Sequence, residues 1–139
     1  MAAQAALASL RGESWPGASR RVPITILFTD PDACAVGMTY EAAVQEGAVV
    51  GTAEGSGNGR SKILGAPENL LHIYADPGSG ALLGASMLLT QGEHLAHLIA
   101  WAIQAKQTVN DLLAMPYYHP SIEEMLQSAL KSASQQMRP

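Results

Sequence analysis

The sequence predicts an α+β domain in which an antiparallel sheet has helices packed on one face. Strand-like apolar runs come first along the chain, and apolar residues at helical spacing follow from Gly92 onward. Strands that precede helices favour this class over an alternating α/β fold. The length of 139 residues suits one domain with a real core. We expect this domain over residues 22–139, preceded by a short helix and a linker over residues 1–21.

Four apolar segments are predicted to be strands. Ile24–Phe28 is rich in β-branched residues and stops at a proline-containing turn, and Val49–Ala53 is a second short run. Leu70–Ala75 and Ala81–Leu89 flank the turn sequence Asp76-Pro77-Gly78-Ser79-Gly80, which predicts a hairpin. These segments supply the strands of the expected antiparallel sheet.

Helices are predicted from apolar spacing and from capping residues. Leu95, Ile99 and Ala102 lie on one face of a helix that begins after Gly92. Thr39 and Thr108 are suitable N-caps for two shorter helices. The glycine-rich segment 55–59 is interpreted as a flexible connection. The predicted helices are Ala2–Leu10, residues 39–46, residues 93–105, Val109–Ala114 and Ser121–Ser134.

The composition limits the classes of partner. The formal net charge is −4 and no basic stripe with interleaved aromatic residues occurs, so a nucleic-acid partner is not expected. No apolar run reaches the roughly 18–20 residues that span a bilayer, so no membrane partner is expected either. The single cysteine, Cys34, cannot form an internal disulfide, which favours a reducing, cytoplasmic setting. Alone, it is interpreted as a small buried apolar residue.

The strongest chemical signal is the decamer of residues 115–124, which contains His119, Pro120, Glu123 and Glu124. A carboxylate that accepts a hydrogen bond from one imidazole nitrogen fixes the tautomer and leaves the other nitrogen to exchange a proton. His119 and Glu124 are therefore the candidate catalytic residues, with Glu123 as the alternative partner. The other interpretation is structural: His119 closes a helix start and Glu124 complements the helix dipole.

The remaining histidines give a weaker signal. His94 and His97 lie three residues apart beside Glu93, which leaves a small metal-dependent hydrolase as a rival hypothesis. A metal site needs at least a third ligand, and the sequence has no H-E-x-x-H motif, so we predict no metal site. His72 falls in a predicted strand and is interpreted as a surface or interface residue.

Several short motifs occur in a fixed order between about Val22 and Leu130. They are Phe28-Thr29-Asp30-Pro31-Asp32 with Val36-Gly37-Met38-Thr39, then Asn58-Gly59-Arg60, Leu82-Leu83-Gly84-Ala85, Thr108-Val109-x-Asp111-Leu112 and His119-Pro120-x-x-x-Glu124. The ordered set resembles the C-terminal dimerisation domain of flavin-dependent pyridine nucleotide-disulfide oxidoreductases. Its pattern is most similar to that of dihydrolipoamide dehydrogenase-like proteins.

This resemblance implies a homodimer in which His119 serves as the acid–base group for a thiolate beside the partner subunit's flavin. Glu124 would orient the ring, and Pro120 would follow a cis peptide bond and lie near that flavin. The apolar residues Met87, Met115, Met125 and Trp101 are interpreted as core by default, although the resemblance implies an apolar two-fold interface.

The resemblance also implies that FAD and NAD(P) are held by upstream domains of the same enzyme. This sequence contains no G-x-G-x-x-G motif and no cysteine pair. We therefore expect a fragment or truncated product whose residues 1–21 are the tail of a flavin domain, and which alone binds no cofactor and is inactive. The alternative is a free-standing binding or assembly module with this fold and no redox role.

Overall fold

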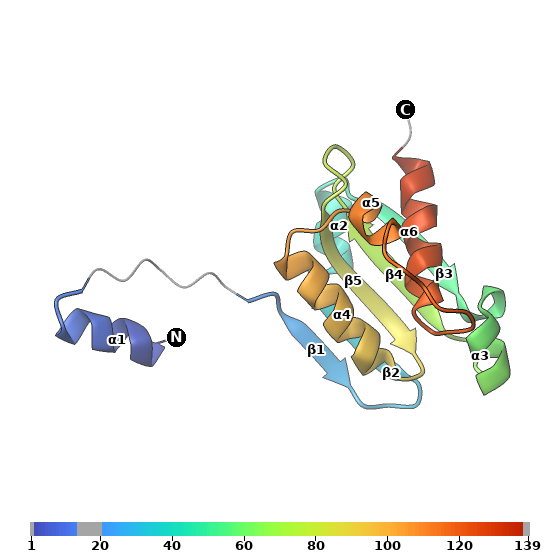
Figure 1. Ribbon diagram of the computed structural model, residues 1–139, viewed down its shortest axis with the longest axis horizontal. Helices are drawn as coiled ribbons and strands as arrows, with labels where there is room; N and C mark the ends of the chain where they lie inside the picture. The colour runs from blue at the N-terminus through green and yellow to red at the C-terminus, as the bar shows by residue number, and fades with distance from the viewer. Residues whose placement is uncertain (1, 14–20, 138–139) are drawn as a thin grey trace.

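The computed structural model describes residues 2–13 and 21–137, and its compact part is a five-stranded sheet with helices against it (Figure 1). The strands are β1 (Ile24–Leu27), β2 (Asp32–Gly37), β3 (Val49–Glu54), β4 (Leu70–Ala75) and β5 (Leu82–Leu89). The helices are α1 (Ala2–Leu10), α2 (Tyr40–Gln45), α3 (Gly59–Leu64), α4 (Gly92–Gln104), α5 (Val109–Leu113) and α6 (Glu124–Gln136), with a short 3-10 helix η1 (Gly55–Gly57). Residues 14–20, which make up most of the predicted linker, lie outside the described residues.

The strands are ordered β1-β2-β5-β4-β3, and each neighbouring pair is antiparallel. The predicted α+β class is therefore confirmed. The predicted hairpin is also confirmed, as β4 and β5 pair on either side of the turn that starts at Asp76. The Asp76 carboxylate accepts hydrogen bonds from the hydroxyl and the backbone N–H of Ser79, both at 2.6 Å, and these lower its pKa. This local bonding ends the strand and closes the turn.

Strand β2 lies in a segment for which no strand was predicted. It pairs with β1 on one side and with β5 on the other, with Cys34 opposite Met87. The segment is short and alanine-rich, and Pro31 precedes it directly, so its intrinsic preference for a strand is weak. Hydrogen bonding to β1 and β5 therefore stabilises β2, although its own residues only weakly favour a strand.

Most of the helical surface covers one face of the sheet. Helix α4 lies over β2 and β5, and α6 lies over β3 and β4 (Figure 1). Helix α2 is the exception, because it lies behind the sheet in Figure 1 and places Tyr40 with its ring centroid 6.0 Å from that of Tyr74. The largest fully buried apolar side chains between the sheet and the covering helices include Leu71, Ile73, Leu89, Ile99, Met125, Leu126 and Leu130.

Helix α6 packs unusually close to β3. A Cβ atom added at Gly51 would overlap the carbonyl oxygen of Ala129 and would lie 2.8 Å from the Cβ of Ala133. Side chains of α6 also satisfy the backbone of β3: Ser132 Oγ accepts from the N–H of Thr52 at 3.2 Å, and Gln136 Nε2 donates to the carbonyl of Val50 at 2.8 Å. The position of α6 is thus set by direct contact with this strand.

Two local predictions differ from the structure in the region of the site. Helix α6 begins at Glu124 rather than at Ser121, and the Glu124 side chain bonds back to the backbone N–H of Ser121, three residues before it. The glycine-rich segment expected to be a flexible connection instead forms η1 and leads directly into α3. The side chain of Asn58 caps α3 by accepting from the N–H of Ser61 at 2.8 Å. Predicted N-caps Thr39 and Thr108 are confirmed.

Within residues 2–13 and 21–137, no helix has the length and apolar character that crossing a membrane requires.

Candidate acid–base site

His119 and Glu124 are in direct contact. His119 Nδ1 lies 3.0 Å from Oε1 and 3.1 Å from Oε2 of Glu124. An ionised carboxylate can only accept hydrogen bonds, so Nδ1 carries the proton and Nε2 is the basic nitrogen of the neutral ring. The His119 side chain is 76% exposed, whereas the Glu124 side chain is 22% exposed. The structure therefore pairs His119 with Glu124, not with Glu123, and leaves Nε2 accessible.

The Glu124 carboxylate is itself held in place. Its Oε2 accepts a hydrogen bond of 2.9 Å from the backbone N–H of Ser121. This bond, followed by the hydrogen bond from His119, lowers the pKa of the Glu124 carboxyl below its ordinary value of 4.5. At neutral pH the group is therefore ionised and fixes the imidazole from one side.

The turn that carries His119 is packed against the start of α3. The peptide bond between His119 and Pro120 is cis, as the family resemblance led us to expect. The backbone of Gly59 lies against this turn, since a Cβ added there would be 3.4 Å from Cε1 of His119 and 3.7 Å from the Cβ of Pro120. The neighbouring Asn58 donates from Nδ2 to the carbonyl of Ser121 at 3.1 Å. From the sequence, Asn58 and Gly59 were assigned to a flexible connection and to a family motif, because no spacing rule links them to His119.

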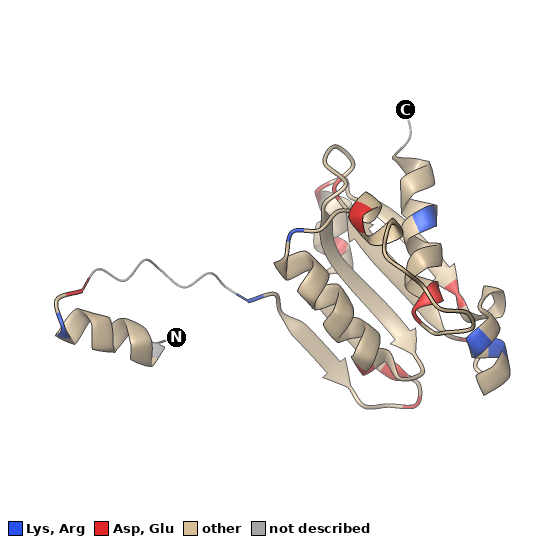
Figure 2. Ribbon diagram, in the orientation of Figure 1, with Lys and Arg blue, Asp and Glu red and all other residues tan. Residues whose placement is uncertain are grey.

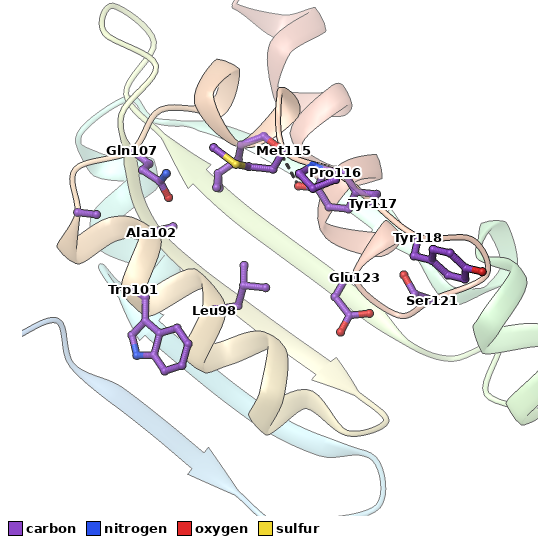
Figure 3. A pocket seen from close by; sticks show the side chains of 12 residues that line it. Leu98, Trp101, Ala102, Gln107, Met115, Pro116, Tyr117, Tyr118, Ser121 and Glu123 are labelled. Atoms are coloured by element: carbon purple, nitrogen blue, oxygen red, sulfur yellow. Dashed lines mark hydrogen bonds between the residues drawn. The ribbon is translucent and has the colours of Figure 1, made fainter.

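An open apolar groove of about 680 Å³ lies beside the site, between α4 and the segment that joins α5 to α6 (Figure 3). Tyr117 is fixed at its rim, because its hydroxyl donates to the carbonyl of Leu112 at 3.1 Å. Trp101 and Met115, which were predicted to be core residues, line this groove and are 69% and 45% exposed. Met87 and Met125 are buried as predicted. The groove also contains Leu98, Ala102, Ala105, Gln107, Pro116, Tyr118, Ser121 and Glu123.

The other histidines are not assembled into a metal site. His94 Nε2 lies 3.4 Å from Oε1 of Glu93, and His97 Nδ1 lies 2.7 Å from the carbonyl oxygen of Glu93. Among the described residues, no group of three or more His, Cys, Asp or Glu side chains is placed to hold a metal ion. The metal-dependent hydrolase hypothesis therefore gains no third ligand. His72 is half-buried in β4, with its ring centroid 6.3 Å from that of Tyr40.

The cysteine is buried, as predicted. Cys34 is 5% exposed, and burial, followed by the charges of Asp32 and Glu93, raises the pKa of its thiol to about 11. A thiol with such a pKa is almost entirely protonated at neutral pH and is a poor nucleophile. Cys34 is a packing residue.

The fold and the sequence agree with one known family. The family described as "Pyridine nucleotide-disulphide oxidoreductase, dimerisation domain" matches residues 23–130. The chain belongs to this family. The matched range contains the whole sheet, α4, α5 and the His119–Glu124 pair. As a member of the family it is a dimerisation domain of the type found in dihydrolipoamide dehydrogenase-like oxidoreductases.

Individual relatives support the assignment. The chain is 32% identical over 114 residues to the dihydrolipoyl dehydrogenase of Halobacterium salinarum, which covers 81% of this chain and 24% of that protein. It is 31% identical over 117 residues to the dihydrolipoyl dehydrogenase of Haloferax volcanii, with 83% and 24% covered. This dimerisation domain thus spans about a quarter of the length of these relatives.

Solved structures show the same fold. LpdA from Mycobacterium tuberculosis superimposes with a TM-score of 0.78 at 23% identity, covering 96% of this chain and 29% of that one. The HOCl-induced flavoprotein disulfide reductase RclA from Escherichia coli gives a TM-score of 0.75 at 22% identity, covering 97% of this chain and 31% of that one. Both likenesses concern the arrangement of the sheet and its helices.

Proposed function

We propose that this dimerisation domain forms a homodimer and supplies His119 and Glu124 to the redox site of the partner subunit in a dihydrolipoamide dehydrogenase-like disulfide oxidoreductase. The observation that carries the proposal is the geometry of His119: one ring nitrogen is held by an anchored carboxylate, and the other faces outward beside an open groove. His119 does not line the groove itself, and its exposed side chain is accessible to a second subunit.

The chemistry of the pair is proton transfer. Nε2 of His119 would accept the proton of a substrate or enzyme thiol as the thiolate forms, and would return it when the disulfide is reduced. Glu124 would stay ionised throughout and stabilise the imidazolium that forms between these steps. The conformation is favourable for this role because the acceptor at Nδ1 is already in place, so little reorientation accompanies the proton transfer.

The electron carriers belong to other parts of the enzyme in this proposal. FAD and NAD(P) would supply electron transfer, and Pro120 of this chain would lie close to the partner's flavin. The His119 side chain is exposed, so it is accessible to groups that another subunit holds. The unpaired Cys34 is consistent with a reducing, cytoplasmic location, which we also propose.

The groove is the surface we assign to dimer contact. Its exposed aromatic residues, Trp101 and Tyr118, are of the kind enriched in interfaces. Figure 2 shows that α4, which forms one wall, carries charge only near its N-terminal end, where Glu93 lies. An apolar wall with charge confined to its rim fits burial against a second protein surface.

The decisive experiment joins residues 22–139 to the flavin and nicotinamide domains of a dihydrolipoyl dehydrogenase relative and measures disulfide reduction. We expect His119→Gln to lower kcat by about 10²–10⁴-fold, the usual contribution of a general acid–base group, with the dimer intact by sedimentation. His94→Gln, a matched exposed histidine beside a glutamate, should leave kcat unchanged.

Unchanged turnover in the His119→Gln chimera would overturn the catalytic part of the proposal. If dimerisation persisted in that case, the alternative of an assembly module without a redox role would stand. A chimera that never dimerises would contradict both the proposed catalytic dimer and the assembly-module alternative.

A further inference from the structure

The described part of the core contains three buried polar side chains, and all three belong to one hydrogen-bond network. Asn58, Ser61 and Asn69 are 6%, 0% and 1% exposed. Asn69 Nδ2 donates to Ser61 Oγ at 3.0 Å, and the backbone N–H of Ser61 donates to Asn58 Oδ1 at 2.8 Å. Buried polar groups are costly unless they are satisfied, and a satisfied network fixes a unique arrangement of the elements it joins.

One end of the network is anchored in the sheet. Asn69 Oδ1 accepts from both the backbone N–H and the hydroxyl of Thr90, at 2.9 and 3.1 Å. Thr90 directly follows β5, the central strand of the sheet. The network is therefore tied to the centre of the sheet.

The other end reaches the acid–base site. Asn58 Nδ2 donates at 3.1 Å to the carbonyl oxygen of Ser121, 63 residues along the chain. The N–H of the same Ser121 donates to Glu124 Oε2. Both backbone polar groups of Ser121 are thus occupied, one by Asn58 and one by the carboxylate that holds His119.

We propose that Asn58 is a positioning residue for the acid–base pair: it fixes the backbone of Ser121 and thereby the contact between Glu124 and His119. This inference rests on the proposed function for its importance to catalysis, but its physical content concerns this chain alone. The bond also holds α3 beside the turn, where Gly59 contacts the imidazole. Without it, the segment from His119 to Ser121 loses its tie to the core.

The test separates the two bonds of Asn58. Asn58→Asp and Asn58→Ser both keep an oxygen that can cap α3, since Asp, Ser and Asn are comparable N-caps. Neither can donate to the carbonyl of Ser121, because a carboxylate has no proton and the serine side chain is too short. Ile73→Val is the control, because it removes one buried methylene from β4, where Ile73 lies opposite Gly51 and Ala85 rather than any residue of the network.

The readout is the tautomer of the His119 ring, measured by nitrogen-15 NMR of the labelled 139-residue chain at a pH where the ring is neutral. We expect the ratio of the Nδ1–H to the Nε2–H form to fall about fivefold in both Asn58 variants, the size expected for the loss of one hydrogen bond of average strength. The control should keep the ratio of the unmodified chain even though it is less stable.

An unchanged ratio in folded Asn58→Ser and Asn58→Asp chains would overturn the proposal, and so would a parallel fall in Ile73→Val. Failure of both Asn58 variants to fold would assign Asn58 to the core as a whole and would also overturn it. The tautomer measurement is independent of turnover. A negative result here leaves the catalytic role of His119 open, and a fully active His119→Gln chimera leaves this measurement valid.

Discussion

The pairs His119–Glu124 and His94–Glu93 are made of the same residue types and lie close together, since His94 and Pro120 line the same cleft of about 260 Å³. Both histidine side chains are about three-quarters exposed, at 76% and 75%. In the first pair the nitrogen contacts both carboxylate oxygens, at 3.0 and 3.1 Å. In the second the ion-pair contact is a single one of 3.4 Å between adjacent residues of a helix.

The difference lies in the carboxylates rather than in the histidines. Glu124 Oε2 is bonded to the backbone of Ser121, whereas Glu93 Oε2 is buried without a hydrogen-bond partner among the described residues. A carboxylate that is fixed by the backbone presents its oxygens in a defined direction. A histidine that is hydrogen-bonded to it is therefore held in a defined orientation as well. Exposed pairs without such support contribute little. An acid–base pair is therefore recognised by what holds its carboxylate.

The largest expected effect comes from removing the charge of each carboxylate in turn. Glu124→Gln should lower the ratio of Nδ1–H to Nε2–H tautomer at His119 by about tenfold, because a charge-assisted acceptor is replaced by a neutral amide. Glu93→Gln should change the ratio at His94 by less than about twofold. Nitrogen-15 NMR at alkaline pH measures both. Equal changes of the tautomer ratio at His119 and His94 would show that the two pairs do not differ in the way proposed.

Substituting alanine for Gly59, next to His119, and for Gly92, next to Glu93, should change the stability of the fold in opposite directions. Gly59→Ala places its Cβ at ordinary contact distances of 3.4 and 3.7 Å and restricts the unfolded chain, so it should stabilise the fold by up to about 1 kcal/mol. Gly92→Ala brings its Cβ to 3.2 Å from Cys34 Sγ and 3.3 Å from the Cβ of Leu89, both in the packed core, and should destabilise it by about 1 kcal/mol.

Urea denaturation of the two glycine variants gives both values. A destabilising Gly59→Ala would show that the turn at His119 is packed more tightly than these distances indicate.

The smallest effect is on the pH dependence of stability. The pKa of Glu124 is lower in the folded chain than its ordinary value of 4.5, so the ionised group stabilises the fold fully above that value. The contribution is lost as the pH falls from about 5 through the lower folded pKa, and for a pair this exposed it should be under about 1 kcal/mol.

Urea midpoints between about pH 7 and pH 3 should therefore fall less steeply in Glu124→Gln than in the unmodified chain. Asp76 and Asp111, whose pKa values are also lowered, contribute equally to both proteins and cancel in the comparison. Parallel curves for the two proteins would contradict a folded-state interaction of the Glu124 charge.

The sequence predicted those features that are encoded locally. The apolar spacing of α4, the turn between β4 and β5, and the caps Thr39 and Thr108 are all short-range signals, and the structure confirms them. The contact between His119 and Glu124 was predicted for the same reason, because the two residues lie five apart along the chain, and their catalytic role stays a prediction.

Features that depend on distant contacts were not predicted. Strand β2 is stabilised by neighbours on both sides rather than by β-branched residues of its own. Helix α3 follows a glycine-rich segment and needs the cap from Asn58, whose second bond reaches Ser121 across 63 residues. The exposure of Trp101 likewise follows from how α4 docks on the sheet, which helical spacing alone does not determine.

The absence of a side chain at Gly51 has a consequence for the site at the far end of α6. The helix rests directly on β3 through Ala129 and Ala133, and Glu124 is its first residue, about one and a half turns before Ala129. Gly51 is thus the point about which the helix would tilt. Any side chain there would lift α6 from the strand and swing the carboxylate of Glu124 relative to the turn that holds His119. The alignment of the two groups is a property of how closely a helix and a strand approach each other, at a position neither group touches.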